Sequence, residues 1–256
     1  MTSLHYLDSH PSSSPAVLLL HGLGANSSSW VLQFDALIGA GFRPIAADTP
    51  GFGKSPYDGK GWSIARSAAA MADLMQELRV GPAHVVGISM GGTIAQQIAL
   101  DFPQSVHRLV LVNTFAILRP TRLSGWFYFL QRFILVHTLG LPAQSRFVAG
   151  RIFPGEDQQM MRDLLIEQIC QADPRAYRAA MRSLGLFNSS TRLREIKNPT
   201  LIVTGDHDTT VPRPSQRMLV EKIHDARQVI IPGAGHAVTI DQPDLFNQAL
   251  LSFLRG

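Results

Sequence analysis

Short, unbroken runs of apolar residues recur along the chain and alternate with segments of helical periodicity. A strand with one exposed face alternates apolar and polar residues, whereas these runs are apolar throughout. Such runs are typical of strands buried on both faces of a parallel sheet. The expected strands are residues 16–22, 43–48, 84–89, 108–113, 200–205 and 227–232.

Between these runs, apolar residues recur at steps of three and four, which predicts amphipathic helices. The clearest helix covers residues 63–79, and a second over 91–102 is stopped by Pro103. A last helix over 243–254 opens with proline, which is favoured in a first helical turn. Alternating strands and helices predict an α/β fold, with a doubly wound, mostly parallel sheet and helices on both faces.

One interval lacks a convincing buried strand. Residues 116–189 show helical patterns at 123–140, 157–172 and 174–187. We therefore expect residues 1–115 and 190–256 to form one core, interrupted by a helical insertion at 116–189 that we call the cap.

Composition narrows the classes of protein. The 256 residues are 45% hydrophobic and 16% charged, which suits a globular domain with a real core. The single cysteine, Cys170, excludes a disulfide within the chain and a cysteine-rich zinc site. We expect no cofactor, no metal and a cytoplasmic location. The first residues lack a basic segment before an apolar stretch, and no apolar run reaches about 18 residues, so neither a signal peptide nor a membrane span is expected.

The net charge of +4 is unevenly distributed. Residues 116–194 hold eleven arginines, no lysine and five acidic residues, and nowhere does the chain have the Lys/Arg run typical of nucleic-acid binding. The cap arginines could receive an anionic partner, such as an acyl carrier protein or a carboxylate-bearing ester, or could form a solvated face. They include Arg119, Arg122, Arg146, Arg151, Arg178 and Arg182.

Polar residues that could do chemistry fall where the expected strands end. Ligands of an open parallel sheet bind at the carboxyl ends of its strands. The residues at these ends are His21, Asp48, Ser89, Asn113, Asp206, Asp208 and His236. They include a serine, a carboxylate and a histidine in that chain order.

The segment Gly87-Ile88-Ser89-Met90-Gly91 matches the G-x-S-x-G nucleophile elbow, in the strand–turn–helix context that this motif needs. Flanking glycines permit the sharp turn that presents a serine hydroxyl. The same sequence would also fit an ordinary strand–helix connection in which Ser89 caps the helix. The following helix N-terminus favours negative charge near the serine.

A serine nucleophile needs a base, and the base needs an acid to orient it. His236, in a glycine-containing loop before the last helix, is the candidate base. Asp206 and Asp208 both follow residues 200–205 and compete for the role of acid; we favour Asp208, because it lies further out on the loop. His236, Asp206 and Asp208 could also be ordinary loop residues without a catalytic role.

The loop over residues 21–30 contains glycines that can turn N–H groups toward a ligand. We expect the N–H groups of Leu23 and Met90 to form an oxyanion hole. A third glycine loop, residues 48–55, lacks the first glycine of a P-loop, which disfavours nucleotide binding.

These motifs together resemble the α/β-hydrolase family. The likeness runs through "LLLHGLG", "DTPGFGKS", "GISMGG", "RLVLVN", "PTLIVTGDHDTTVP" and "GAGH" followed by "DQP", and covers nearly the whole chain. It implies an eight-stranded, mostly parallel sheet with the cap after the sixth strand. It also implies Ser89 as nucleophile, Asp208 as acid, His236 as base, and Leu23 and Met90 as oxyanion donors.

We therefore expect a serine esterase that forms an acyl-enzyme with a small-molecule ester whose acyl group is small to medium and largely apolar. The alternatives are a lactonase, a C–C bond hydrolase, an acyl-carrier-type methyl esterase, or a ligand receptor without turnover on a hydrolase scaffold. A monomer or a homodimer is expected. The residues expected to line an acyl pocket, or else to pack between cap and sheet, are Trp126, Phe127, Phe129, Leu130 and Phe133.

Overall fold

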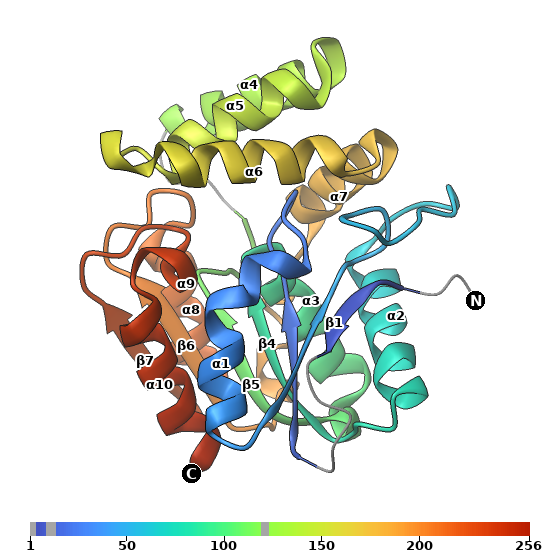
Figure 1. Cartoon of the computed structure of the whole chain (residues 1–256), viewed down its shortest axis with the longest axis vertical. Helices are drawn as coiled ribbons and strands as arrows, with labels where there is room; N and C mark the ends of the chain where they lie inside the picture. The colour runs from blue at the N-terminus through green and yellow to red at the C-terminus, as the bar shows by residue number, and fades with distance from the viewer. Residues whose placement is uncertain (1–3, 9–13, 119–122) are drawn as a thin grey trace.

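The computed structural model describes residues 4–8, 14–118 and 123–256, which contain seven strands (Figure 1). They form one sheet in the order β1-β3-β2-β4-β5-β6-β7, in which β1 is antiparallel to β3 and all other neighbours are parallel. The strands are β1 (Tyr6–Asp8), β2 (Ala16–Leu20), β3 (Arg43–Ala47), β4 (Ala83–Ile88), β5 (Val106–Val112), β6 (Thr200–Gly205) and β7 (Ala226–Ile231).

The predicted fold class, a mostly parallel sheet covered by helices, is confirmed, but the expected count of eight strands is corrected to seven in the described residues. Ahead of β1 these residues include only Leu4 and His5, which are too few to add a strand beside it. The cap therefore follows the fifth strand, β5, and not the sixth.

Helices connect the strands and build the cap. In the core they are α1 (Val31–Gly39), α2 (Ile64–Glu77), α3 (Met90–Asp101), α8 (Arg213–Lys222), α9 (Val238–Asp241) and α10 (Pro243–Arg255), with 3-10 turns at Ser27–Trp30, Pro103–Ser105 and Leu193–Glu195. In the cap they are α4 (Leu123–Thr138), α5 (Gly140–Ile152), α6 (Gln159–Gln171) and α7 (Pro174–Leu186), with a 3-10 turn at Glu156–Gln158. The sequence pattern did not predict α1, α5 and α8.

Burial on both faces explains the unbroken apolar runs of β2, β4 and β6. The edge strand β7 is largely exposed, so the expected burial of residues 227–232 on both faces is wrong. Along β2, Leu18 and Leu20 belong to the hydrophobic cluster that includes residues of α2 and α3. The intervening Val17 and Leu19 belong to the opposite cluster, which includes residues of α1 and α10. Because successive strand side chains point to opposite faces, a strand covered on both sides favours apolar residues at nearly every position.

The cap helices α4 to α7 lie together over one end of the sheet, at the top of Figure 1. The two chain segments that lead into and out of the cap run side by side. Ile117 forms a bridge with Asn188, and the N–H of Ser189 donates to the carbonyl of Ala116 at 2.9 Å. The cap is thereby placed over the strand ends where the candidate catalytic residues lie.

The packing of α10 against one face of the sheet contributes to the stability of the core. Phe246 is fully buried, with its ring 6.3 Å from that of Trp30. Phe246→Ala is expected to lower the free energy of unfolding by about 3–5 kcal/mol, because the cavity left behind cannot fully collapse. Urea unfolding measures the loss.

The neighbouring Leu245 provides the matched control, since it lies on the same helix and is 38% exposed. Leu245→Ala is expected to cost less than about 1.5 kcal/mol. Equal losses for the two variants would contradict this assignment of the core.

Candidate active site

The connection from β4 to α3 holds Ser89 in a backbone conformation that side-chain-bearing residues rarely adopt. Its φ and ψ are +53° and −114°. Three hydrogen bonds fix it: the Ser89 N–H donates to Val112 O at 2.9 Å, and the Ser89 carbonyl accepts from Thr114 Oγ1 at 2.7 Å and from the Thr93 N–H at 3.2 Å. A strained residue that several contacts hold in place is typical of a functional position.

The glycines around Ser89 are required by close contact between backbones. A Cβ atom at Gly91 would lie 2.1 Å from the carbonyl oxygen of Leu20 at the end of β2. A Cβ atom at Gly87 would lie 2.2 Å from the carbonyl oxygen of Gly91 itself. The sequence motif is thus a steric requirement, and it brings the start of α3 directly against the neighbouring strand.

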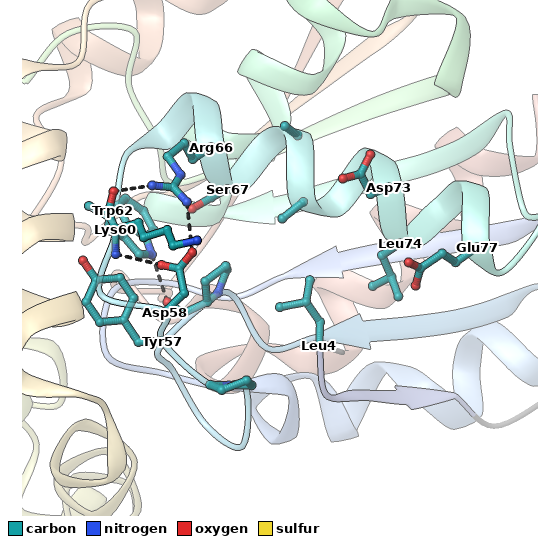
Figure 2. Close-up of a pocket in the computed structure, with 15 residues that line it drawn as sticks. Leu4, Tyr57, Asp58, Lys60, Trp62, Arg66, Ser67, Asp73, Leu74 and Glu77 are labelled. Atoms are coloured by element: carbon teal, nitrogen blue, oxygen red, sulfur yellow. Dashed lines mark hydrogen bonds and ion pairs between the residues drawn. The ribbon is translucent and has the colours of Figure 1, made fainter. Parts of the chain in front are cut away.

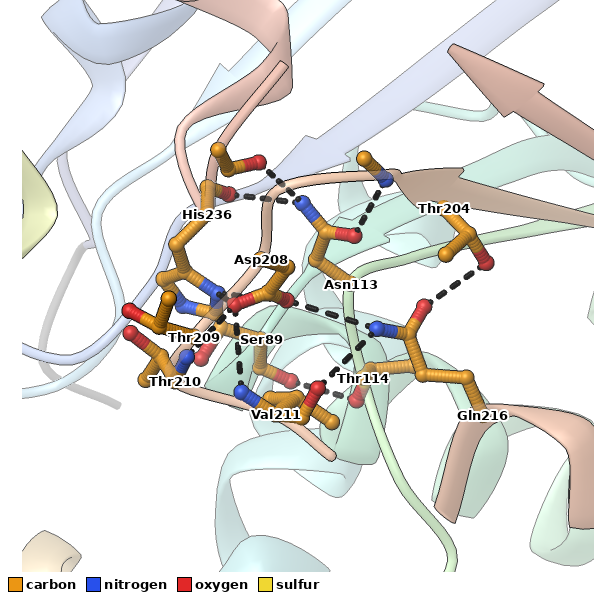
Figure 3. A network of polar contacts seen from close by, with 12 residues as sticks. Ser89, Asn113, Thr114, Thr204, Asp208, Thr209, Thr210, Val211, Gln216 and His236 are labelled. Atoms are coloured by element: carbon orange, nitrogen blue, oxygen red, sulfur yellow. Dashed lines mark hydrogen bonds and ion pairs between the residues drawn. The ribbon is translucent and has the colours of Figure 1, made fainter. Parts of the chain in front are cut away.

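His236 and Asp208 meet at the same sheet edge (Figure 3). Nδ1 of His236 lies 3.1 and 3.2 Å from the two carboxylate oxygens of Asp208, whose side chain is 1% exposed. A carboxylate accepts, so Nδ1 carries the proton and Nε2 is left as the basic nitrogen. Asp206, the competing candidate, instead places its carboxylate 3.9 Å from His207.

Asp208 is oriented by its own loop and by α8. Its Oδ1 accepts from the N–H groups of Thr210 at 2.8 Å and Val211 at 3.1 Å, which closes an Asx-type turn. Its Oδ2 accepts from Nε2 of Gln216 at 3.3 Å. Gln216 is fixed in turn by Thr204, whose hydroxyl donates to the amide oxygen at 2.8 Å. The acid therefore has one defined orientation toward His236.

Asn113, at the end of β5, secures the loop that carries His236. Its Nδ2 donates to the carbonyls of Gly235 at 3.0 Å and His236 at 2.9 Å, and its Oδ1 accepts from the Gly205 N–H at 2.9 Å (Figure 3). On the other side of the loop, Asp241 accepts from the N–H of Gly235 at 2.8 Å. The sequence named Asn113 only as a polar residue at the end of an expected strand; in the structure its hydrogen bonds hold the loop that carries His236.

The loop that carries Leu23 is anchored by two buried polar side chains. Nδ1 of His21 donates to Gly22 O at 2.8 Å, and Nε2 accepts from the Thr49 N–H at 3.0 Å; burial lowers the pKa of His21 and keeps the ring neutral. Asp48 accepts from the Ser27 N–H at 2.6 Å. Although burial by itself raises the pKa of Asp48, this bond and the one from the Lys54 N–H at 2.8 Å lower it overall.

Ser89, His236 and Leu23 line one cavity of about 430 Å³ between the sheet edge and the cap. The fully buried Met90 is the first residue of α3, whose first-turn N–H groups have no partner within the helix. Most of the lining is apolar. The cap contributes Tyr128, Arg132, Val148, Ile152, Phe153, Met161, Leu164, Leu165 and Gln168.

The five residues of α4 expected to line an acyl pocket are not part of this cavity lining. Phe129 is half-buried, and the other four point outward, with exposed fractions of 60% for Trp126, 65% for Phe127, 53% for Leu130 and 54% for Phe133. Tyr128 and Arg132, four residues apart and therefore on one face of α4, line the cavity instead. The sequence missed both, because α4 is apolar on several sides and its pattern does not single out the inner face.

The cap arginines named from the sequence have different surroundings. Arg119 and Arg122 lie outside the described residues. Arg146, Arg151 and Arg182 are exposed, and Arg178 is half-buried. Arg151 links the cap to the acid loop, because Nη2 donates to Thr209 O at 2.9 Å while the guanidinium lies 4.5 Å from the ring centroid of Tyr128. An anionic partner at this surface stays a prediction.

A second hollow, of about 700 Å³, lies away from these residues, between the loop around Tyr57 and helix α2 (Figure 2). Two of its charged side chains are paired, because Arg66 Nη2 donates to Asp58 at 3.1 Å, and Asp58 also accepts from the Lys60 N–H at 2.9 Å. The hollow brings no base to a nucleophile, so we place the candidate site in the cavity at Ser89.

The described residues also bear on metal binding and on membrane insertion. No group of three or more His, Cys, Asp or Glu side chains there is arranged to hold a metal ion. No helix in that part of the chain is both long and apolar enough to cross a membrane.

Comparison with known proteins gives matches along the whole chain. A family model described as "Alpha/beta hydrolase family" matches residues 17–249. A proposed carbamate hydrolase, RutD, of Variovorax paradoxus is 32% identical over 98% of this chain and 96% of its own length. The 2-hydroxy-6-oxononadienedioate/2-hydroxy-6-oxononatrienedioate hydrolase of Comamonas testosteroni is 30% identical over 93% of this chain and 87% of its own.

Among solved structures, the enol-lactonase of Burkholderia xenovorans superposes with a TM-score of 0.90. It is 26% identical to this chain, and the alignment covers 99% of this chain and 96% of the other.

The close contact at Gly91 predicts a large effect from a single methyl group. Gly91→Ala is expected to lower the free energy of unfolding by at least about 2 kcal/mol, because backbone, and not a flexible side chain, would have to move. The control is Gly39→Ala in α1, where an added Cβ meets nothing within 4 Å and helix propensity favours alanine by about 0.5–1 kcal/mol. Similar melting temperatures for the two variants would show that the elbow is loosely packed.

The hydrogen bonds of Asn113 predict that it governs the reactivity of Ser89 through His236. Asn113→Ala is expected to slow labelling of Ser89 by a fluorophosphonate about 10- to 100-fold, because His236 is then held less accurately as a base. Mass spectrometry of the labelled peptide gives the rate, and circular dichroism checks the fold. An unchanged labelling rate in a folded variant would remove the positioning role.

Proposed function

The chain belongs to the alpha/beta hydrolase family, and from this premise we propose that it is a serine hydrolase that cleaves carboxylic esters through an acyl-enzyme. The observation that carries the proposal is the shared cavity of a strained Ser89 and a histidine whose Nδ1 is bound by a buried carboxylate. Relatives named for hydrolysis of a carbamate, of 2-hydroxy-6-oxononadienedioate and of an enol lactone support a hydrolytic reaction without selecting the bond.

In the first half-reaction, Ser89 Oγ attacks the carbonyl carbon of the ester while Nε2 of His236 takes its proton. The resulting imidazolium is stabilised by Asp208, which also keeps the ring in the required tautomer. The N–H groups of Leu23 and Met90 are the proposed donors to the oxyanion. When the C–O bond breaks, the alcohol leaves with the proton from His236, and the acyl group stays on Ser89.

In the second half-reaction, water takes the place of the alcohol. His236 removes a proton from the water as its oxygen attacks the acyl carbon, and returns that proton to Ser89 Oγ as the acid departs. The apolar lining from α5 and α6, which includes Val148, Ile152 and Leu164, supports an acyl group of small to medium size that is largely apolar along its length.

Hydrolysis of lactones is a second candidate, favoured by the likeness to the enol-lactonase. The same attack on a ring ester gives an acyl-enzyme in which the alcohol stays tethered. A panel that pairs p-nitrophenyl esters with lactones of matched carbon number compares the two by their kcat/KM values.

Ser89→Ala is expected to lower kcat for p-nitrophenyl butyrate at least about 10⁴-fold, because no nucleophile remains to accept the acyl group. Rapid quenching of the unsubstituted protein is expected to show the butyryl mass on the peptide that contains Ser89. Ser252→Ala, at an exposed serine of α10, is the control and is expected to behave like the unsubstituted protein. Turnover by a folded Ser89→Ala variant would overturn the proposal.

A further inference from the structure

Arg132 is a buried cation in the wall of the catalytic cavity. It lies on the inner face of α4, is 9% exposed, and lines the same cavity as Ser89 and His236. It is the only arginine of the described residues that is buried. The rest of the cavity wall is mostly apolar, so a charge there faces a medium of low polarity.

The contacts of Arg132 within the protein are with neutral groups. Its Nη2 lies 3.2 Å from the hydroxyl oxygen of Tyr177, and the amide oxygen of Gln144, turned toward the guanidinium, accepts from Nε at 2.8 Å and from Nη2 at 3.2 Å. Its Cζ lies 5.6 Å from the ring centroid of Tyr128. The hydrogen bonds to Tyr177 and Gln144 use Nε and Nη2, and the Tyr128 side chain is a further neutral partner.

No carboxylate in the described parts of the chain lies within 4 Å of the Arg132 guanidinium. The contrast with other arginines is clear, since Arg43, Arg66, Arg175, Arg192 and Arg217 are all more exposed and each is paired with Asp or Glu. A buried guanidinium loses hydration that neutral partners replace only in part, and an anion restores it best. The protein therefore keeps a desolvated positive charge in the cavity that Ser89 also lines, without supplying the counter-charge.

We propose that Arg132 binds a carboxylate carried by the substrate, so that the preferred esters have an apolar chain ending in a carboxylate. This proposal rests on the proposed function and specifies its substrate class. A carboxylate fits better than a phosphate monoester, because one guanidinium balances one negative charge, whereas a phosphate monoester brings about −1.5 to −2 at pH 7 into an apolar cavity. The low polarity of the wall strengthens the interaction.

The competing explanation is that Arg132 only joins α4 to Gln144 of α5 and Tyr177 of α7. A structural joint would affect charged and neutral substrates alike. Mono-p-nitrophenyl adipate and its methyl ester separate the two, because they share the reacting carbonyl and the chain and differ in the charge at the far end.

The unsubstituted protein is expected to favour the free carboxylate at least about 10-fold in kcat/KM. Arg132→Met is expected to lower that preference about 10- to 100-fold, the range of a hydrogen bond to a charged group, and Arg132→Lys is expected to keep part of it. Arg146→Met, at an exposed arginine of α5 that is not part of the cavity wall, is the control and is expected to keep the preference. Inhibition of p-nitrophenyl butyrate hydrolysis by hexanoate, which carries one negative charge on an apolar chain, is expected to weaken by the same factor in Arg132→Met.

A preference that is absent from the unsubstituted protein, or unchanged in Arg132→Met, overturns the proposal. If Arg132→Met does not fold, the preference of the unsubstituted protein and the Arg132→Lys variant decide. Failure of the proposed function itself has a different signature, because then neither ester is turned over. Binding of hexanoate to the unsubstituted and Arg132→Lys proteins, measured by calorimetry, in that case still tests the anion site.

Discussion

The close approach of two backbones at the end of β4 is the constraint on which the site depends. Gly91 at the start of α3 lies so near the carbonyl of Leu20 that no side chain fits between them. The chain can make this contact only by turning sharply at Ser89, which accepts a positive φ and is held there by hydrogen bonds to β5 and its following loop. Packing energy from the sheet thus maintains a local strain that exposes one hydroxyl group to the cavity.

The polar residues around this turn either contact His236 directly or fix the loops that carry His236 and Asp208. Asp208 touches His236 directly, whereas Asn113 and Gln216 act from behind and fix the loops on which the acid and the base lie. These two loops follow the neighbouring strands β6 and β7, and Asn113 follows the adjacent strand β5, so their relative positions are set by the sheet. The cap contacts these loops through Arg151, which donates to Thr209 O, and through Gln158, which donates to Asp241, and otherwise it forms part of the cavity wall. Reactivity and selectivity are therefore built from different parts of the chain.

The sequence was most informative where backbone geometry dictates residue type. Strands buried on two faces need continuous apolar runs, and a turn under backbone contact needs glycines, so the sheet and the position of Ser89 followed from local patterns. The choice of Asp208 over Asp206 depended on a loop conformation that only the structure defines. Arg132 and the outward direction of Trp126 depend on how α4 is rotated in the folded cap, and a helix that is apolar on several sides carries no signal for that rotation. The sequence did not predict that Asn113 holds the loop of His236, because its three partners are backbone groups far away in the sequence.

The paired ends of the cap have a consequence for how this scaffold can diversify. The chain leaves the core at Ala116 and returns at Ser189, and these two residues are joined by a hydrogen bond. The insertion is therefore a loop whose two ends are held together by the core. Closing such a loop costs entropy that grows only with the logarithm of its length, about 0.6 kcal/mol for each doubling. The closure entropy therefore changes little when helices between these two points are lengthened, shortened or exchanged for those of a relative. The cap side chains that such a change must keep are those packed against the core, such as Ala176 beside Gly51 and Tyr177 beside Phe52. New cavity walls are thus open to evolution, and to grafting in the laboratory, without rebuilding the strand ends beneath them.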